Sequence, residues 1–189
     1  MRNNIFPNIL PLGALSSWIS ETKPLHCQPN IANWLYDHNS LTKKLESQCN
    51  HFSVKVKQQI SVKPSDILSN YFSQEDKVLI REVFLYCDEK PVIFAQTEIP
   101  FSTLTAEQSR LAEIGEQSLG KILFQDPSML RGQIEVTEFH KDSLFHQLAD
   151  DLQQSTSHSL WARRSLFYLE NKPLLVSELF LPASGIYNE

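Results

Sequence analysis

The chain has 189 residues and a formal net charge of −5, because 22 Asp and Glu outnumber 17 Lys and Arg. Hydrophobic residues make up 41% and aromatic residues 10%, a composition that folds as one domain without a disulfide or metal staple. The acidic balance disfavours a general nucleic-acid binder, which is usually basic. No apolar run approaches the ~20 residues of a membrane span. We therefore expect no nucleic-acid partner and no stable membrane insertion.

The three cysteines, Cys27, Cys49 and Cys87, are odd in number and form no Cys-x-x-Cys motif. They indicate neither a disulfide framework nor a zinc knuckle, and the six histidines show no ligand spacing. Free thiols fit a reducing compartment. Proline and glycine interrupt the apolar run at the start of the chain, which disfavours a signal peptide. We therefore expect a cytoplasmic protein with no metal site and no cleaved signal.

Residues 1–26 are rich in proline and weakly patterned, and we expect an N-terminal extension packed on a single domain of residues 27–189. Pro29 suits the first turn of a helix that runs to about Asp37. The Ser40 hydroxyl can cap a second short helix that continues through Leu45.

The next part of the chain is typical of strands. Alternation over 51–62 predicts a strand, and a helical turn is expected around 67–72. Two apolar runs at 78–86 and 91–99 are separated by residues 88–90, a hairpin-length loop.

A helical region follows. Thr105 with Gln108 three residues later has the pattern of a capping box, and Gly115 ends the predicted helix. Ser118 can cap another short helix that runs through Phe124. Residues 129–139 are predicted to form a strand.

Residues 141–158 form an acidic excursion that we predict to be helical, with a solvated polar side. Its apolar side is predicted to consist of Leu144, Phe145, Leu148 and Leu152. Runs at 160–169 and 173–181 predict a final hairpin around residues 170–172. Together these elements predict an α+β domain with a mainly antiparallel sheet and helices on one side or end.

Two charged residues lie in strands that are apolar on both sides. Glu178 lies in the run 173–181, where a buried carboxylate needs a partner, a ligand or a proton. Arg81 lies among apolar residues in the run 78–86 and keeps its charge. In one interpretation the two form a core ion pair with each other. In the other, Arg81 binds the carboxylate of an anionic ligand and Glu178 lies at the ligand's far end.

Two adjacent arginines, Arg163 and Arg164, lie in the run 160–169. Neighbouring side chains of a strand point to opposite faces, so only one of them could face a site with Arg81. The sequence does not choose between them.

Six ordered blocks, which together cover about residues 30–187, resemble the chorismate pyruvate-lyase family of ubiquinone biosynthesis. They are Ser40-Leu-Thr-Lys43, Leu79-Ile-Arg-Glu-Val-Phe-Leu85, Ile99-Pro-Phe-Ser-Thr-Leu104, Ser118-Leu-Gly-Lys-Ile-Leu-Phe124, Trp161-Ala-Arg-Arg-Ser165 and Lys172-Pro-Leu-Leu-Val-Ser-Glu-Leu-Phe-Leu-Pro-Ala-Ser184. The last block is the most specific.

The resemblance implies a single-domain antiparallel sheet with a buried ligand cavity under helical flaps. It implies conversion of chorismate to 4-hydroxybenzoate and pyruvate, without a cofactor, by a protein that we expect to be a monomer. Arg81 would bind the ring carboxylate, and Leu41 and Leu119 would cover the ring from the flaps. Glu178 would lie at the oxygen-bearing end. Arg81 and Glu178 are thus the expected catalytic residues.

The sequence departs from the family at two places. In the family, the position of Leu41 is often occupied by Met, and Leu is tolerable there if side-chain bulk and backbone contacts are what matter. The excursion at 141–158 is also longer than is usual in the family. A non-catalytic module of the same fold that binds an aromatic acid, as in effector-binding domains of bacterial regulators, is the alternative function. A structural protein, in which Arg81 and Glu178 pair with each other, is a third.

Chorismate carries two carboxylates, so we expect Arg81 to bind one and Arg163 or Arg164 to bind the other. We hypothesise that apolar surroundings keep Glu178 protonated, so that it acts as an acid or hydrogen-bond donor at the ether oxygen. A sealed site also predicts that product release limits turnover.

Overall fold

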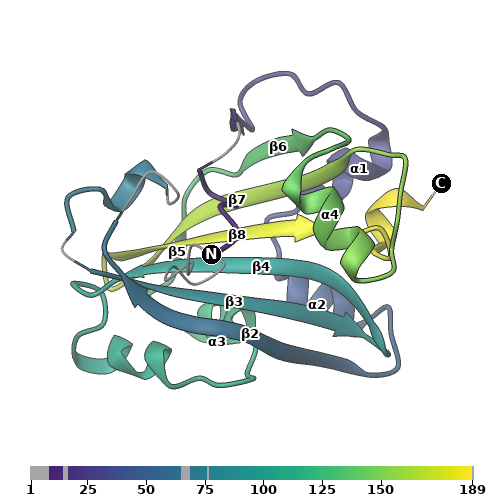
Figure 1. Cartoon of the computed structure of the whole chain (residues 1–189). Coiled ribbons are helices and arrows are strands. Elements are labelled where there is room, and N and C mark those ends of the chain that lie inside the picture. Colours follow the sequence, from purple (N-terminus) through teal and green to yellow (C-terminus); the bar gives the residue numbers. More distant parts are fainter. Residues whose placement is uncertain (1–8, 15–16, 65–68, 76, 189) are drawn as a thin grey trace, which may run out of the picture.

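The computed structural model describes residues 9–14, 17–64, 69–75 and 77–188, which form one antiparallel sheet with helices on both faces (Figure 1). The strands are β1 (Ile19–Ser20), β2 (Phe52–Val62), β3 (Val78–Cys87), β4 (Lys90–Pro100), β5 (Leu130–Arg131), β6 (Glu135–Phe139), β7 (Leu160–Leu169) and β8 (Lys172–Phe180). Their order is β1-β6-β7-β8-β4-β3-β2, and β5 pairs with β7 beside this path. The predicted α+β domain with a mainly antiparallel sheet is confirmed.

The described helices are short. The α-helices are α1 (Pro29–Leu35), α2 (Leu41–Glu46), α3 (Leu119–Gln125) and α4 (Leu144–Asp151), and the 3-10 helices are η1 (Asn70–Phe72), η2 (Ala106–Ala112) and η3 (Gly185–Tyr187). Helices α1, α2 and α3 lie on one face of the sheet, which we call the helical face, and α4 lies on the opposite face (Figure 1). None of these helices has the length and hydropathy that a membrane span requires.

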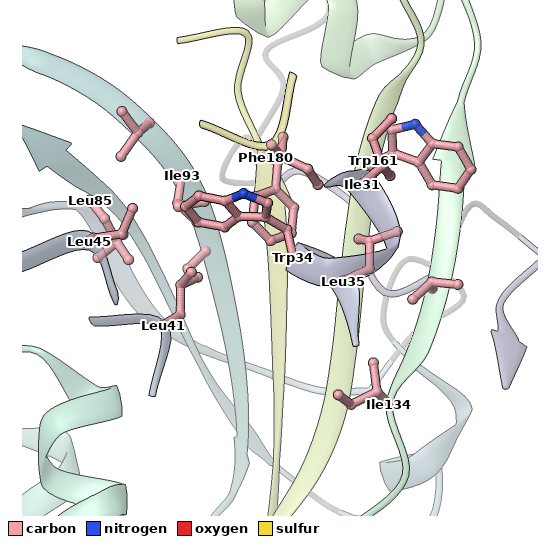
Figure 2. Close-up of a cluster of buried hydrophobic side chains, with 14 of the residues drawn as sticks. Ile31, Trp34, Leu35, Leu41, Leu45, Leu85, Ile93, Ile134, Trp161 and Phe180 are labelled. Atoms are coloured by element: carbon pink, nitrogen blue, oxygen red, sulfur yellow. The ribbon is translucent and has the colours of Figure 1, made fainter. Parts of the chain in front are cut away.

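The helical face is built around aromatic packing between α1 and β8. Ile31, Trp34 and Leu35 are buried at the i, i+3 and i+4 positions of α1, the spacing of a single helix side. The rings of Trp34 and Phe180 meet edge to face, with centroids 6.0 Å apart. Figure 2 shows this cluster, in which Leu41 of α2 lies on the side toward β3 and β4. The packing holds the ends of α1 and α2 close to the middle of the sheet.

The opposite face buries α4, so the helices are not confined to one side or end of the sheet, contrary to the prediction from sequence. The rings of Phe145 and Phe139 lie 4.3 Å apart between centroids, and Ala149 is fully buried. Leu144, predicted to be apolar core, is 49% exposed. The helix begins at Leu144 and ends at Asp151, so it is shorter than the predicted helical stretch of 141–158.

The N-terminal segment also covers the opposite face. The Leu10 amide donates to Oε1 of Glu82 at 2.9 Å, and the Leu10 carbonyl accepts from the Gln96 amide. Glu82 and Gln96 are buried and hydrogen-bonded to each other, so the backbone of Leu10 joins a polar network that is already formed on the sheet. Farther along, β1 pairs with β6. The division of the chain at residue 26 stays a prediction.

Two predicted elements differ from the structure. The capping box is wrong: η2 is a 3-10 helix, and the Thr105 hydroxyl donates weakly to the Ser102 carbonyl instead. The Gln108 side chain contacts Glu170 and Lys172, because it is buried against the β7–β8 turn. The predicted strand 129–139 is two strands, β5 and β6, which both pair with β7 on either side of a break.

The predicted helix starts at Pro29, Ser40 and Ser118 are confirmed, and so are both hairpins. The hydroxyls of Ser40 and Ser118 accept from the amides of Lys43 and Lys121 at 3.3 and 3.2 Å. The turn between β7 and β8 has positive φ at Glu170 and Asn171, the geometry that favours tight hairpins. Of the predicted turn at 67–72, residues 67 and 68 lie outside the described residues, and the rest includes η1.

Leu35→Ala tests the packing of α1. Leu35 is fully buried, so its truncation should lower the free energy of unfolding by about 2–5 kcal/mol. Leu144→Ala in α4 is the matched control and should change it by less than about 0.5 kcal/mol. Urea unfolding measures both; a loss at Leu144 equal to that at Leu35 would contradict the burial described here.

Candidate active site

A narrow cavity lies between the helical face of the sheet and helices α2 and α3. Its volume is about 40 Å³, room for only a few water molecules. Its charged lining consists of Arg81, Arg131, Arg163 and Glu178, and its apolar lining includes Leu41, Val54, Val83, Leu85, Ala95, Leu119, Leu123, Phe124, Phe167 and Val176. An apolar cavity with a few convergent charged groups has the character of a small-molecule site.

The strand register brings the candidate residues to this face. Arg81 on β3 lies opposite Thr97 on β4, and Thr97 lies opposite Val176 on β8. Glu178 lies two residues beyond Val176 and directly opposite Arg163 on β7. Residues opposite each other in an antiparallel sheet share a face, so Arg81, Glu178 and Arg163 all point to the helical side.

Arg81 is buried without a counterion. It is 1% exposed, and its Nη2 donates to the carbonyls of Gly115 and Gln117 at 2.8 and 3.1 Å. Its Nε has no hydrogen-bond partner among the described residues, and none of their carboxylates lies within ion-pair distance. Burial lowers the Arg81 pKa to about 10. This guanidinium is therefore positioned to receive an anion, and the interpretation that it pairs with Glu178 is wrong.

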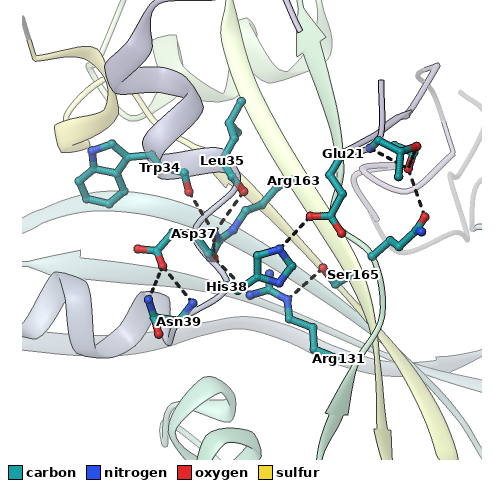
Figure 3. Close-up of polar contacts among 12 residues, drawn as sticks. Glu21, Trp34, Leu35, Asp37, His38, Asn39, Arg131, Arg163 and Ser165 are labelled. Carbon is teal, nitrogen blue, oxygen red and sulfur yellow. Dashed lines mark hydrogen bonds and ion pairs between the residues drawn. The ribbon is translucent and has the colours of Figure 1, made fainter. Parts of the chain in front are cut away.

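Glu178 pairs with Arg163 instead. Oε2 of Glu178 lies 2.7 Å from Nε of Arg163. Nη1 of Arg163 donates to the carbonyls of Trp34, Leu35 and Asp37 at 3.0, 3.4 and 2.9 Å (Figure 3). These carbonyls lie at the C-terminal end of α1, where helix carbonyls lack partners and favour a cation. Arg163 therefore links α1 to the Glu178 carboxylate.

The surroundings of Glu178 differ from the apolar environment that the sequence suggested. Its side chain is 17% exposed, and the Arg163 guanidinium touches it directly. The carboxylate therefore has a charged hydrogen-bond partner in place of an apolar pocket. The sequence suggested a protonated Glu178 because its neighbours along β8 are apolar. The partner on the adjacent strand β7, Arg163, is not visible in that pattern.

Arg164 does not face the cavity. Its Nε lies 2.7 Å from Oε2 of Glu135, and its Nη1 donates to the Gly13 carbonyl at 2.7 Å. Its guanidinium lies 4.4 Å from the ring centroid of Trp18 and 5.3 Å from that of Tyr71. Arg164 therefore attaches the N-terminal segment to the opposite face, and the arginine that lines the cavity is Arg163.

Sequence reasoning missed Arg131. It lies on β5 opposite Phe167, and its Nε donates to the Ser165 hydroxyl at 3.1 Å. Burial, with a further contribution from neighbouring Arg163, lowers the Arg131 pKa to about 10. The signal that singled out Arg81, an arginine inside a long apolar strand, is absent here, because β5 has only two residues and polar or small residues, Gly132 and Gln133, follow it.

Helices α2 and α3 close the cavity as two flaps. Leu41 and Leu119, each the first residue of its helix, are buried and line the cavity. The hydroxyls of Thr42 and Ser118 lie 2.7 Å apart and join the flaps. A Cβ on Gly120 would lie 2.9 Å from the Thr42 hydroxyl oxygen, so this close approach requires glycine. A ligand larger than a few waters requires these flaps to move apart.

The cavity offers guanidinium donors rather than metal ligands. Within the part of the chain that the structure describes, no three His, Cys, Asp or Glu side chains gather closely enough to hold a metal ion. The arrangement suits an aromatic or cyclic anion: a cation at one end, an ion-paired carboxylate near the other, and apolar side chains between.

A double-mutant cycle on unfolding free energy tests the ion pairing. Arg163→Met and Glu178→Gln should be coupled by about 0.5–3 kcal/mol, because each removes the other's partner. The control cycle of Arg81→Met with Glu178→Gln should show coupling below about 0.5 kcal/mol. Strong coupling of Arg81 to Glu178 in ligand-free protein would contradict the geometry.

Solved structures share the fold at low sequence identity. The effector domain of PhnF from Mycobacterium smegmatis matches with a TM-score of 0.52 and 14% identity, over 76% of this chain and 88% of that one. The ligand-binding domain of a putative GntR-family regulator from Bordetella bronchiseptica matches with a TM-score of 0.52 and 10% identity, over 71% and 87%. These likenesses concern the fold alone.

Sequence relatives are much closer. A protein of Psychromonas ingrahamii named "Probable chorismate pyruvate-lyase" is 59% identical over 95% of this chain and 97% of its own length. A protein of the same name from Shewanella sp. strain ANA-3 is 36% identical over 96% of both chains. A family model described as chorismate lyase matches residues 14–189. The chain therefore belongs to the chorismate lyase family.

Proposed function

We propose that this protein is a chorismate pyruvate-lyase, which converts chorismate to 4-hydroxybenzoate and pyruvate at the start of ubiquinone biosynthesis. The observation that carries the proposal is the cavity itself. It places an uncompensated guanidinium, Arg81, and an ion-paired carboxylate, Glu178, in an otherwise apolar cavity closed by two flaps. The names of the relatives support the same reaction. A cytoplasmic monomer without cofactor belongs to this proposal.

Arg81 binds the ring carboxylate of chorismate. Its Nε is the buried donor without a partner, and a carboxylate there would also neutralise a charge that burial penalises. Leu41 and Leu119 lie at the first turns of the flaps and provide apolar cover for the ring. Because this site binds through charge and shape, it orients the ring with its carboxylate toward Arg81 and its C4 oxygen toward Glu178.

The reaction is an elimination. The ether bond at ring C3 breaks, its electron pair leaves with the enolpyruvyl oxygen, and C4 loses a proton as the ring becomes aromatic. The leaving enolpyruvate gains one proton on its methylene carbon and becomes pyruvate. No oxidant or reductant is required, so the protein's tasks are orientation, charge placement and proton handling.

Glu178 receives the proton from C4. Its carboxylate is charged and held in place by Arg163, which suits a base better than the acid role expected from sequence. Glu178→Gln keeps the shape and removes the base, so we expect kcat to fall by about 10²–10⁴-fold. Stopped-flow and steady-state assays with chorismate measure it. A kcat within about threefold of wild type would mean that Glu178 only positions the substrate.

The flaps predict slow product release. The closed cavity is too small for free exchange of an aromatic acid, so α2 and α3 must separate before 4-hydroxybenzoate leaves. We expect a burst of product in the first turnover. A pre-steady-state record without a burst would show that chemistry, not release, limits kcat.

The proposed function is tested by incubating the protein with chorismate in metal-free buffer and measuring both products against a no-enzyme control. We expect equimolar 4-hydroxybenzoate and pyruvate from the wild type, and a large loss in Arg81→Gln because the ring carboxylate loses its cation. If chorismate is unchanged but 4-hydroxybenzoate raises the melting temperature, the protein is a binding module of this fold. If neither occurs, the proposed function is wrong.

A further inference from the structure

The charges that line the cavity do not balance. Three guanidinium groups, from Arg81, Arg131 and Arg163, share it with a single carboxylate, that of Glu178. Glu178 compensates Arg163, so two positive charges are left in a protein whose net charge is −5. Partly buried charges without partners are costly, and a ligand with two negative charges would neutralise both.

Arg131 is the second uncompensated cation. Its Nε and Nη1 donate to the Ser165 hydroxyl and the Asp37 carbonyl at 3.1 and 3.3 Å (Figure 3). Its Nη2 makes no hydrogen bond to the described residues, and no carboxylate among them lies within 4.0 Å of its guanidinium. The neutral hydroxyl and carbonyl fix the orientation of the side chain but leave its charge for another group.

Arg131 and Arg163 lie side by side, because the Asp37 carbonyl accepts from Nη1 of both, at 3.3 and 2.9 Å. Adjacent like charges repel, and Glu178 contacts only Arg163. Arg163 is already committed to Glu178 and to the end of α1. The guanidinium that remains available to an anion at this end of the cavity is therefore that of Arg131.

The strand register separates Arg131 from Arg81. Ser165, which holds Nε of Arg131, lies in one row with Val176, Thr97 and Arg81 across strands β7, β8, β4 and β3. Three strand spacings separate the Cα atoms of Ser165 and Arg81 by about 14 Å. The two uncompensated guanidiniums thus approach the cavity from opposite sides, with Thr97 and Val176 on its floor between them.

We infer that Arg131 binds the second carboxylate of chorismate, on the enolpyruvyl group, an inference that rests on the proposed function. With the ring carboxylate on Arg81 and C4 toward Glu178, the ether at the neighbouring C3 leaves the ring on the Glu178 side. Arg131 borders that side, because it shares the Asp37 carbonyl with Arg163, which contacts Glu178. Arg131 thereby positions the bond that breaks, and it distinguishes the dianionic substrate from the monoanionic aromatic product.

Arg131→Gln tests this assignment, with chorismate and 4-hydroxybenzoate as the two ligands. We expect kcat/KM for chorismate to fall by at least about 30-fold, since a desolvated charge pair is lost. The dissociation constant of 4-hydroxybenzoate, which lacks the second carboxylate, should change by less than about threefold. Arg131→Lys, which keeps the charge, should recover part of the loss.

Arg81→Gln is the matched control and should weaken both ligands, because both carry the ring carboxylate. Equal loss of both ligands in Arg131→Gln, at an unchanged melting temperature, would mean that Arg131 does not act through the second carboxylate and would overturn the inference. Unchanged kcat/KM would overturn it too. If the wild type releases no pyruvate, the proposed function fails, and direct titration of chorismate into wild type and Arg131→Gln still decides the role of Arg131.

Discussion

The contact between Arg163 and Glu178 connects the fold to the site. A strand register places the two side chains opposite each other on β7 and β8, and the C-terminal carbonyls of α1 hold the guanidinium. An isolated carboxylate or guanidinium in this position would carry a large desolvation cost. Since each partner orients the other, the carboxylate that we assign to proton transfer is held before any ligand enters. The packing of Trp34 on Phe180 keeps α1 in place for this purpose.

The same electrostatics suit the cavity to the anionic substrate that we propose, although the protein is acidic overall. Arg81 and Arg131 are held by carbonyl and hydroxyl groups, which fix their direction without cancelling their charge. Burial lowers the pKa of both to about 10, so the protein pays in stability for cations that a ligand can neutralise. The flaps then exclude water, and the interaction between these charges and a bound carboxylate strengthens in the dry cavity.

Much of this arrangement was predictable from local patterns. A charged residue in an apolar strand singled out Arg81 and Glu178. Register across strands was not predictable, so neither the Arg163–Glu178 pair nor the choice between Arg163 and Arg164 followed from sequence. Arg131 was missed because its strand is two residues long and the break after it has no strong sequence signal. The capping box failed because Gln108 has tertiary partners, and a short pattern carries no information on those.

A crystal structure of the wild-type protein with 4-hydroxybenzoate tests the central claim most directly, that Arg81 and Glu178 define the two ends of the ligand. The account predicts the carboxylate of the product on Nε of Arg81, its hydroxyl toward Glu178, and the Arg163–Glu178 pair intact. A product bound in the reverse direction, with its carboxylate on Arg131 and its hydroxyl toward Arg81, would contradict both the proposed orientation and the assigned roles.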